Sequence, residues 1–218
     1  KKVAIVGLGG TGSYLLDLVA KIPVAEINLF DDDIFSTHNA FRAPGAASLD
    51  ELKRGFSKVE YFATKYSAMH RHIIPHMERI IEETIAKLFG MDIVFVCVDN
   101  VKVRNFISRH LAEQNVPFID SGLGVEMRNG GNLAGLVRST NFDGKYGDHL
   151  SKSFGTEEIE DDGVYNTNVQ VAELNDLAAI LMIMRWKRQL GFYASDKSNC
   201  IEEVFNIAAN KILSQYES

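Results

Sequence analysis

Short apolar runs alternate with longer amphipathic segments through the first half of the chain. Four mostly apolar runs have the length and composition of buried parallel strands: 3–6, 27–30, 93–98 and 117–119. A fifth short strand is expected at 73–77. Between the strands, helices are expected at 11–20, 58–68, 82–89 and 103–114. This alternation predicts a three-layer α/β domain with a mostly parallel sheet.

The pattern changes after Gly122. Two short runs, 125–128 and 133–138, flank an Asn-Gly-Gly-Asn stretch, which predicts an antiparallel hairpin that extends one edge of the sheet. Residues 139–166 are polar and rich in glycine and acidic side chains, so we expect a long crossover-type loop there.

The last part of the chain is predicted to be helical. A long helix is expected over 166–190, with Gly191 as its stop, and a final helix over 201–215. Because no repeat or linker interrupts these segments, we expect residues 1–218 to form one domain. The sequence begins at Lys1 and enters a strand at once, as expected for a segment of a longer chain.

Charge and composition indicate which binding partners and which compartment to expect. The net charge is −6 and no lysine and arginine run is dense, so nucleic acid is an unexpected partner. The apolar stretches are too short to span a bilayer, and no signal peptide is recognisable at the start. Two cysteines without a Cys-x-x-Cys motif fit a reducing compartment, so we expect a cytoplasmic protein without a membrane partner.

A glycine-rich turn follows the first predicted strand and opens a helix. Gly7, Gly9, Gly10 and Gly12 fit a Gly-x-Gly-x-x-Gly turn, in which the missing Cβ atoms let the backbone approach a phosphate. Asp31 ends the second predicted strand, where a carboxylate can accept hydrogen bonds from a ribose. The pair predicts an adenosine nucleotide but leaves NAD and ATP equally open.

A carboxylate beside the phosphates distinguishes the two nucleotides. Asp99 and Asn100 follow the 93–98 strand, which should lie next to the first strand at the point where chain order reverses. A carboxylate there repels phosphate unless a cation lies between them. We therefore expect Asp99 to hold Mg²⁺ and the nucleotide to be ATP.

Cationic residues support the same interpretation. Arg42 lies shortly after Asp31, within Asn39-Ala40-Phe41-Arg42, and Lys58 begins a predicted helix. Arginine offers a planar fork to phosphate oxygens and lysine a mobile point charge. Because nucleotidyl transfer depends on positioning and on charge neutralisation, Arg42, Lys58 and Asp99 are the candidate catalytic residues.

In order and spacing, these motifs resemble the ThiF/MoeB/HesA family. The resemblance rests on Gly-Leu-Gly-Gly-Thr-Gly-Ser, the Asp31 run, Asn39-x-x-Arg42, Gly55-x-x-Lys58 and Asp99-Asn100-x-x-x-Arg104, and it covers nearly the whole chain. It implies a Rossmann-like adenylation domain. Such a domain uses Mg²⁺ and ATP to adenylate the C-terminal glycine of a ubiquitin-like protein or peptide. The resemblance implies a homodimer as well.

The resemblance also implies roles by position. Asp31 would hold the ribose, Asn39 and Arg42 would contact the phosphates, and Lys58 would stabilise the region of the transferring α-phosphate. Asp33 and Asn100 adjoin these motifs and are placed among the nucleotide-binding residues. Arg104 matches a motif position to which we assign no role.

The cysteines depart from the family pattern. Many members carry two Cys-x-x-Cys pairs for zinc; this sequence has none, so we expect no zinc. Residues 139–166, where other members place a nucleophilic cysteine, contain no cysteine. Cys97 lies in an apolar strand and is expected to be inert. Cys200, just before the predicted final helix, is the candidate thiol because a helix N-terminus lowers the pKa of a cysteine.

Three alternatives to adenylation of a ubiquitin-like protein stay open. Relatives exist that adenylate a small-molecule or an RNA-attached carboxylate. The glycine loop and Asp31 also fit an NAD-dependent dehydrogenase. A non-catalytic regulatory half of a heterodimer is disfavoured, because such halves usually lose the arginine, lysine or aspartate that this chain keeps.

Overall fold

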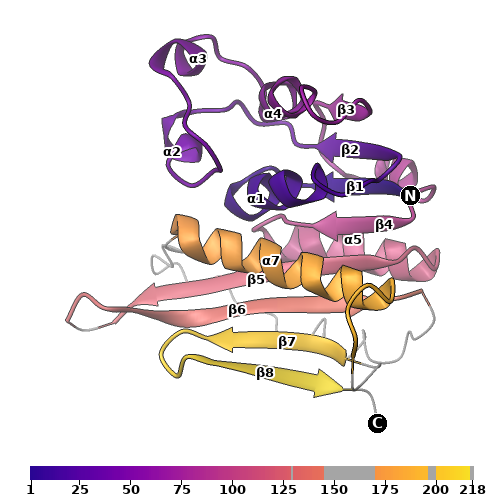
Figure 1. Cartoon of the computed structure of the whole chain (residues 1–218), viewed down its shortest axis with the longest axis vertical. Coiled ribbons are helices and arrows are strands. Elements are labelled where there is room, and N and C mark those ends of the chain that lie inside the picture. The colour runs from indigo at the N-terminus through magenta and orange to yellow at the C-terminus, as the bar shows by residue number, and fades with distance from the viewer. Residues whose placement is uncertain (129, 145–169, 196–199, 217–218) are drawn as a thin grey trace.

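One twisted sheet forms the centre of the computed structural model, which describes the chain except residues 129, 145–169, 196–199 and 217–218 (Figure 1). Within the described residues the sheet has eight strands in the order β3-β2-β1-β4-β5-β6-β7-β8. The five strands from β3 to β5 run parallel, and β6, β7 and β8 continue the sheet antiparallel. The strands are β1 (Lys2–Val6), β2 (Glu26–Phe30), β3 (Ile73–His76), β4 (Ile93–Val96), β5 (Phe118–Met127), β6 (Leu133–Phe142), β7 (Cys200–Asn206) and β8 (Lys211–Tyr216).

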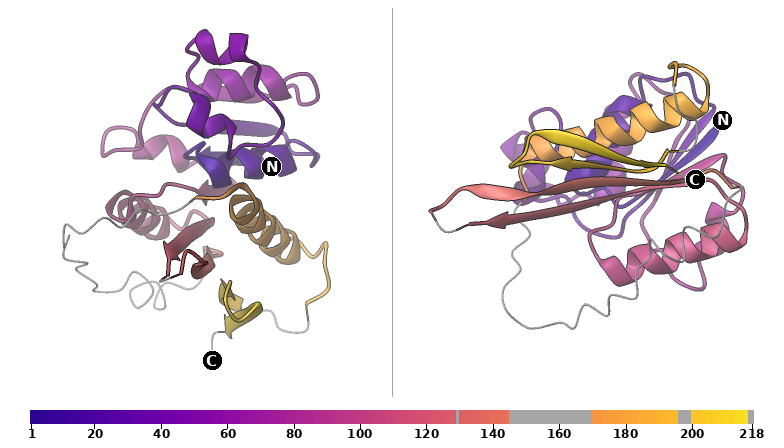
Figure 2. Two further views of the ribbon diagram at one scale, coloured as in Figure 1. Left: turned by 90° about the vertical axis from the view of Figure 1, so that its left-hand side faces the viewer. Right: turned by 90° about the horizontal axis from the view of Figure 1, so that it is seen from below.

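Helices cover both faces of the parallel part, which confirms the three-layer prediction. The helices α1 (Gly10–Val19), α4 (Lys58–Tyr66) and α7 (Ala172–Gln189) contribute to one apolar cluster. The helix α5 (Val101–Glu113) and the 3₁₀ turn η1 (Ile85–Leu88) contribute to the other. Figure 2 shows α7 and α5 on opposite sides of the sheet.

Residue alternation along the strands explains the two clusters. In β1, Val3 and Ile5 face the α1 side, whereas Ala4 and Val6 face the α5 side. Successive side chains of a strand point to opposite faces, so a strand buried on both faces must be apolar throughout. The continuous apolar runs of the sequence are therefore the central strands, as predicted.

Local polar groups fix where two of the helices begin. Ser57 caps α4 through a reciprocal capping box with Glu60. Asn100 caps α5, because its side-chain oxygen accepts a hydrogen bond from the backbone N–H of Val103 at 3.1 Å. The short helices α2 (Thr37–Ala40) and α3 (Leu49–Lys53) connect β2 to α4. In the described part of the chain, none of the helices combines the length and hydrophobicity that a membrane crossing requires.

Two boundaries in the middle of the chain were predicted wrongly. The 117–119 strand and the first hairpin strand are one continuous strand, β5, because Ser121 and Gly122 pair with Ser139 and Arg138 of β6. For the same reason, residues 139–142 belong to β6 and not to the crossover-type loop. The rest of that loop and the start of the predicted 166–190 helix lie mainly outside the described residues. The described helix begins at Ala172.

The predicted final helix over 201–215 is wrong. This segment forms the antiparallel pair β7 and β8, and β7 pairs with β6. Glutamate and alanine favour a helix here, but tertiary pairing outweighs that weak preference. Two asparagines mark the turn: Asn206 accepts from the Ala209 N–H, and Asn210 has a φ of 49°. The predicted helix over 82–89 is likewise only the single turn η1.

A buried ion pair holds β7 against α7. Glu203 is buried, and its carboxylate lies 3.2 Å from Arg185 Nη2 and 2.9 Å from Arg188 Nη1. Arg185 is itself buried and also donates to the Cys200 carbonyl oxygen. These contacts fix the β7–β8 hairpin to the helix that packs on the sheet.

Removing the Glu203 carboxylate should destabilise the chain strongly. Glu203→Ala leaves Arg185 buried without its counter-ion, which typically costs about 3 kcal/mol or more in the free energy of unfolding. The control is Glu113→Ala, at an exposed position at the end of α5. It should change the free energy of unfolding by less than about 0.5 kcal/mol. Urea unfolding followed by circular dichroism measures both. Equal effects of the two substitutions would show that the ion pair does not anchor the hairpin.

Candidate functional site

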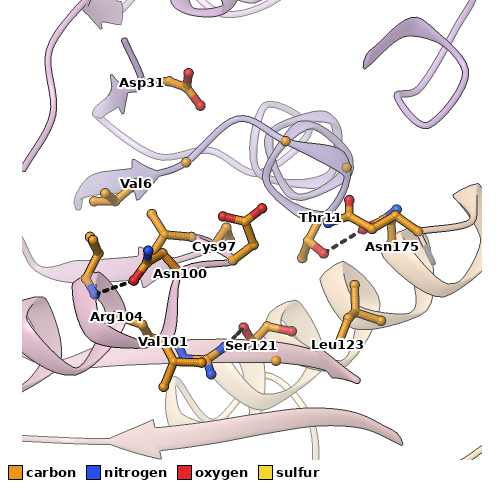
Figure 3. Close-up of a pocket in the computed structure, with 18 of the residues that line it drawn as sticks. Val6, Thr11, Asp31, Cys97, Asn100, Val101, Arg104, Ser121, Leu123 and Asn175 are labelled. Carbon is orange, nitrogen blue, oxygen red and sulfur yellow. Dashed lines mark hydrogen bonds between the residues drawn. The ribbon is translucent and has the colours of Figure 1, made fainter. Parts of the chain in front are cut away.

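A large cleft opens at the carboxyl ends of the parallel strands, where β1 and β4 lie side by side (Figure 3). Chain order reverses there, as the sequence predicts, and open α/β sheets bind ligands at such a point. The cleft has a volume of about 1280 Å³. The glycine loop, the ends of β2 and β4, and the hairpin of β5 and β6 line it.

The glycine loop is folded so tightly that three of its positions have no room for a Cβ atom. At Gly7, which has a φ of 89°, a Cβ would lie 2.9 Å from the carbonyl oxygen of Cys97. A Cβ on Gly12 would overlap the carbonyl oxygen of Gly7, and one on Gly10 would overlap the Asn175 side chain. Gly9 differs, because no atom lies within 4 Å of the place its Cβ would take. Gly9 therefore leaves the cleft open next to the N-terminus of α1.

Asp31 connects the end of β2 to the glycine loop. Its Oδ2 atom accepts a hydrogen bond from the Leu8 N–H at 2.7 Å, and its Oδ1 atom accepts one from the Asp33 N–H at 2.9 Å. The carboxylate lines the cleft, as its predicted ribose contact requires. Asp31 also fixes the conformation of the glycine loop through its hydrogen bond with Leu8.

The structure places Lys58 beside two carboxylates. Its Nζ atom lies 2.6 Å from Asp33 Oδ2 and 3.3 Å from Asp31 Oδ1. The hydrogen bond from Lys58 is the main cause that lowers the pKa of Asp33 below the usual range of a carboxyl group. Lys58 lines the cleft, so its charge is near the glycine loop but is already paired.

Arg42 lines the same cleft with unsatisfied hydrogen-bonding capacity. Its Nε atom is buried and has no hydrogen-bond partner among the described residues. Buried polar atoms are nearly always paired, so the Arg42 side chain keeps hydrogen-bonding capacity that the described protein atoms do not use. Asn39 is placed differently: it is buried at the start of α2, and its Oδ1 accepts from the backbone N–H and the hydroxyl of Ser36. Asn39 thus orders the turn that carries Arg42.

Asp99 is exposed in the cleft, two residues beyond Cys97 and next to the cap of α5. A solvent-facing carboxylate near an open glycine loop fits the expected magnesium ligand, because Mg²⁺ prefers carboxylate and phosphate oxygens. The carboxylates of Asp31, Asp32 and Asp33 also converge within 4.8 Å. That group already has cationic partners, since Lys58 and Arg79 form ion pairs with it. Asn100 lines the cleft but uses its side-chain oxygen to cap α5.

Sequence reasoning missed a residue that reaches the glycine loop from α7. Asn175 accepts a hydrogen bond from the Thr11 hydroxyl at 3.0 Å and lies against Gly10 (Figure 3). The two residues are 164 positions apart in the chain. No local motif marks Asn175, which stands between Leu174 and Asp176 in the first turn of the helix.

Arg104 belongs to a buried polar cluster in the cleft wall. Its Nε lies 3.3 Å from Asp120 Oδ2, and its Nη1 donates to the Ser121 carbonyl oxygen at 3.1 Å. Arg138 of β6 lies 3.9 Å from the same Asp120 oxygen. Burial lowers the pKa of Arg104, and the Asp120 carboxylate partly opposes this shift. Sequence reasoning missed Asp120 and Arg138, because neither lies in a recognised motif.

The two cysteines differ in their relation to the cleft. Cys97 lines it below the glycine loop, where burial, followed by the charge of Asp120, raises the pKa of the thiol. Cys200 begins the strand β7, so its predicted position just before a helix is wrong. Its sulfur lies 3.5 Å from Arg185 Nη2 and is not among the atoms that line the cleft.

Comparison with known proteins identifies the family. The model of the ThiF family matches residues 1–159, more than half of the chain. The chain belongs to the ThiF family. Its curated relatives include ubiquitin-like modifier-activating enzyme 5 of Drosophila mojavensis, 30% identical over 141 residues, or 56% of this chain and 34% of the relative. They also include molybdopterin-synthase adenylyltransferase of Haemophilus influenzae, 31% identical over 131 residues, or 58% of this chain and 51% of the relative.

Solved structures share the fold of this chain. Escherichia coli MccB superposes with a TM-score of 0.76 at 21% identity, over 99% of this chain and 61% of MccB. MccB with AMPCPP and MccA superposes with a TM-score of 0.74 at 22% identity, over 99% of this chain and 63% of that chain. This ThiF-family chain spans about a third to a half of the length of the curated relatives described above.

The glycine loop yields a prediction about stability. Gly12→Ala should destabilise the ThiF-type fold by about 3 kcal/mol or prevent folding, because the new methyl overlaps the Gly7 carbonyl oxygen. Gly9→Ala adds the same methyl to open space, so it should change the free energy of unfolding by less than about 0.5 kcal/mol. Thermal and urea unfolding compare the two variants. Equal losses of stability would mean that the loop is not packed as described.

Proposed function

We propose that the chain binds ATP with Mg²⁺ in the cleft between β1 and β4 and transfers AMP to a carboxylate. The proposal rests on the open space at Gly9 and on the cationic and acidic side chains that line the same cleft. Arg42 has a buried Nε with no partner in the described part of the chain, Lys58 supplies an ammonium, and Asp99 is an exposed carboxylate in the same cleft. Membership of the ThiF family supports it, as do relatives named adenylyltransferase and modifier-activating enzyme.

The nucleoside would lie between the glycine loop and the start of α5. Asp31 lines the cleft at the end of β2, where it would accept hydrogen bonds from the ribose hydroxyls. Three solvent-exposed apolar side chains of the cleft, Ile81, Val101 and Val103, offer a surface for the adenine ring. An adenine ring that covers these side chains would remove their apolar surface from water, which favours binding.

The triphosphate would rest on the N-terminus of α1. Free amides and the missing Cβ of Gly9 favour an anion there, and Arg42 and Lys58 would neutralise it. Asp99 would hold Mg²⁺, which on binding neutralises charge on the phosphates and lets pyrophosphate leave. The substrate carboxylate would attack the α-phosphorus, the bond to the pyrophosphate oxygen would break, and an acyl-adenylate would result.

We propose that the carboxylate is the C-terminus of a ubiquitin-like protein or a peptide. The cleft continues beyond the glycine loop along β5 and β6, past Gly124 and Leu136, as far as Asn206 of β7. A Cβ on Gly124 would meet no atom within 4 Å, so an extended chain can approach the floor closely. A small carboxylate would leave this length of the cleft unused. The likeness in fold to MccB, which has been solved in complex with AMPCPP and MccA, supports a second binding partner beside the nucleotide.

Several further predictions from the sequence stay predictions. They include the homodimer, the cytoplasmic location and the absence of zinc. An NAD-dependent dehydrogenase shares the glycine loop and Asp31 with the adenylation function. A dehydrogenase would have no use for the Asp99 carboxylate next to the phosphates, so ATP is the proposed nucleotide.

Nucleotide binding tests the proposed function. Mg-ATP at about a hundred times its dissociation constant should stabilise the chain by about 2.7 kcal/mol, which raises the melting temperature by several degrees. NAD should raise it little. Gly9→Ala should fold normally and lose most of the ATP effect, because its methyl occupies the phosphate site. Stabilisation by NAD but not by Mg-ATP would overturn the proposal.

Catalysis needs a separate measurement, because binding alone does not show adenylation. With a carboxylate substrate present, the chain should exchange labelled pyrophosphate into ATP. Asp99→Ala should abolish exchange without loss of stability, and Arg42→Ala should reduce it by on the order of 10²-fold, as loss of a preorganised charge does. Asp50→Ala, at an exposed position of α3, is the control. Near-normal exchange in Asp99→Ala would exclude its assigned role.

A further inference from the structure

Lys58 has two carboxylate partners that differ in their surroundings. Its Nζ lies 2.6 Å from Asp33 Oδ2 and 3.3 Å from Asp31 Oδ1. The side chains of Lys58 and Asp31 are only 7% and 8% exposed, whereas that of Asp33 is 59% exposed. The lysine therefore has one buried and one solvent-facing counter-ion.

Only the buried carboxylate is fixed by the backbone. Asp31 accepts hydrogen bonds from the N–H groups of Leu8 and Asp33, one on each oxygen. The Asp33 carboxylate accepts a hydrogen bond from Lys58, and the charges of Arg79 and His38 act on it without a hydrogen bond. Asp33 can therefore leave the lysine by a side-chain rotation, whereas Asp31 cannot move without disturbing the glycine loop.

The shorter of the two ion pairs conflicts with binding of a phosphate. Lys58 and Asp33 both line the cleft in which the proposed function places the triphosphate. An ammonium that donates to Asp33 is less available to phosphate, and an ionised carboxylate in the same place repels it. Arg42 has no such conflict, since its Nε has no hydrogen-bond partner among the described residues.

We propose that Asp33 is an exchangeable counter-ion of Lys58. Without nucleotide, Asp33 holds the Lys58 ammonium at the cleft wall; when ATP binds, a phosphate group replaces Asp33 on Nζ. Asp31 stays in place and keeps the ammonium beside the glycine loop. This inference rests on the proposed function, and it makes Asp33 a positioning residue instead of a direct ligand of the nucleotide.

The exchange explains why the chain has both carboxylates. If Asp31 were the only partner of the buried Lys58, the other hydrogen atoms of the ammonium would have no acceptor in the protein without nucleotide. Burying a charged group without hydrogen-bond partners is costly. Asp33 supplies that acceptor from the solvent side. Because the Asp33 side chain is exposed, its ion pair with Lys58 should be weak enough for a phosphate to replace it.

The test compares affinities for Mg-ATP and for adenosine by calorimetry. Asp33→Asn should bind Mg-ATP about threefold or more tightly than wild type, because no ion pair has to break. Its affinity for adenosine, which has no phosphate, should not change. Asp33→Glu, which keeps the charge, should retain the weaker binding of wild type. Asp50→Asn removes the same charge from an exposed position of α3 and should leave both affinities unchanged.

A double-substitution cycle separates ion-pair exchange from simple repulsion. In a Lys58→Met background no ion pair exists, so Asp33→Asn should increase the affinity for Mg-ATP less than it does in wild type. Equal gains in both backgrounds would overturn the inference, as would weaker binding of Mg-ATP by Asp33→Asn or an equal gain for adenosine. Wild-type protein that fails to bind Mg-ATP at all would instead refute the proposed function.

Discussion

The close approach of the glycine loop to itself and to β4 is the constraint on which the rest of the site depends. The carbonyl oxygen of Gly7 occupies the space next to Gly12, and Gly7 lies against the carbonyl group of Cys97. This packing turns the chain from β1 directly into α1, so that the helix N-terminus faces the cleft. It also brings the Leu8 N–H within 2.7 Å of Asp31, which joins the loop to the end of β2. A single side chain at either of the two crowded positions would separate these elements.

Contacts from distant parts of the chain complete this arrangement. Asn175 of α7 packs on Gly10 and accepts from Thr11, while Arg185 of the same helix holds the β7–β8 hairpin through Glu203. The helix thus connects the glycine loop at one end of the cleft to the antiparallel strands at its other end.

Sequence reasoning found the parts of the site that local chemistry marks. The glycine turn, Asp31 and Asp99 follow buried apolar strands, so their common edge of the sheet was predictable from the parallel order alone. It did not find Asn175 or Asp120, because both act through contacts that span many residues. It predicted a helix in place of the strands β7 and β8 for a similar reason. The pairing of Phe205 with Val137 outweighs the helical preference of the segment, and no local signal reports that pairing. Lys58 was identified by its position, yet its two ion pairs depend on how β2 and α4 meet.

The proposed function requires the cleft at the junction of β1 and β4 to bind the triphosphate of ATP over Gly9. A crystal structure of the chain with Mg²⁺ and AMPCPP, an ATP analogue, tests this claim most directly. The phosphates should lie at the N-terminus of α1, with Arg42 and Lys58 within hydrogen-bonding distance and Mg²⁺ bound to Asp99. Density for the nucleotide elsewhere on the molecule, or phosphates that contact neither Arg42 nor Lys58, would contradict it.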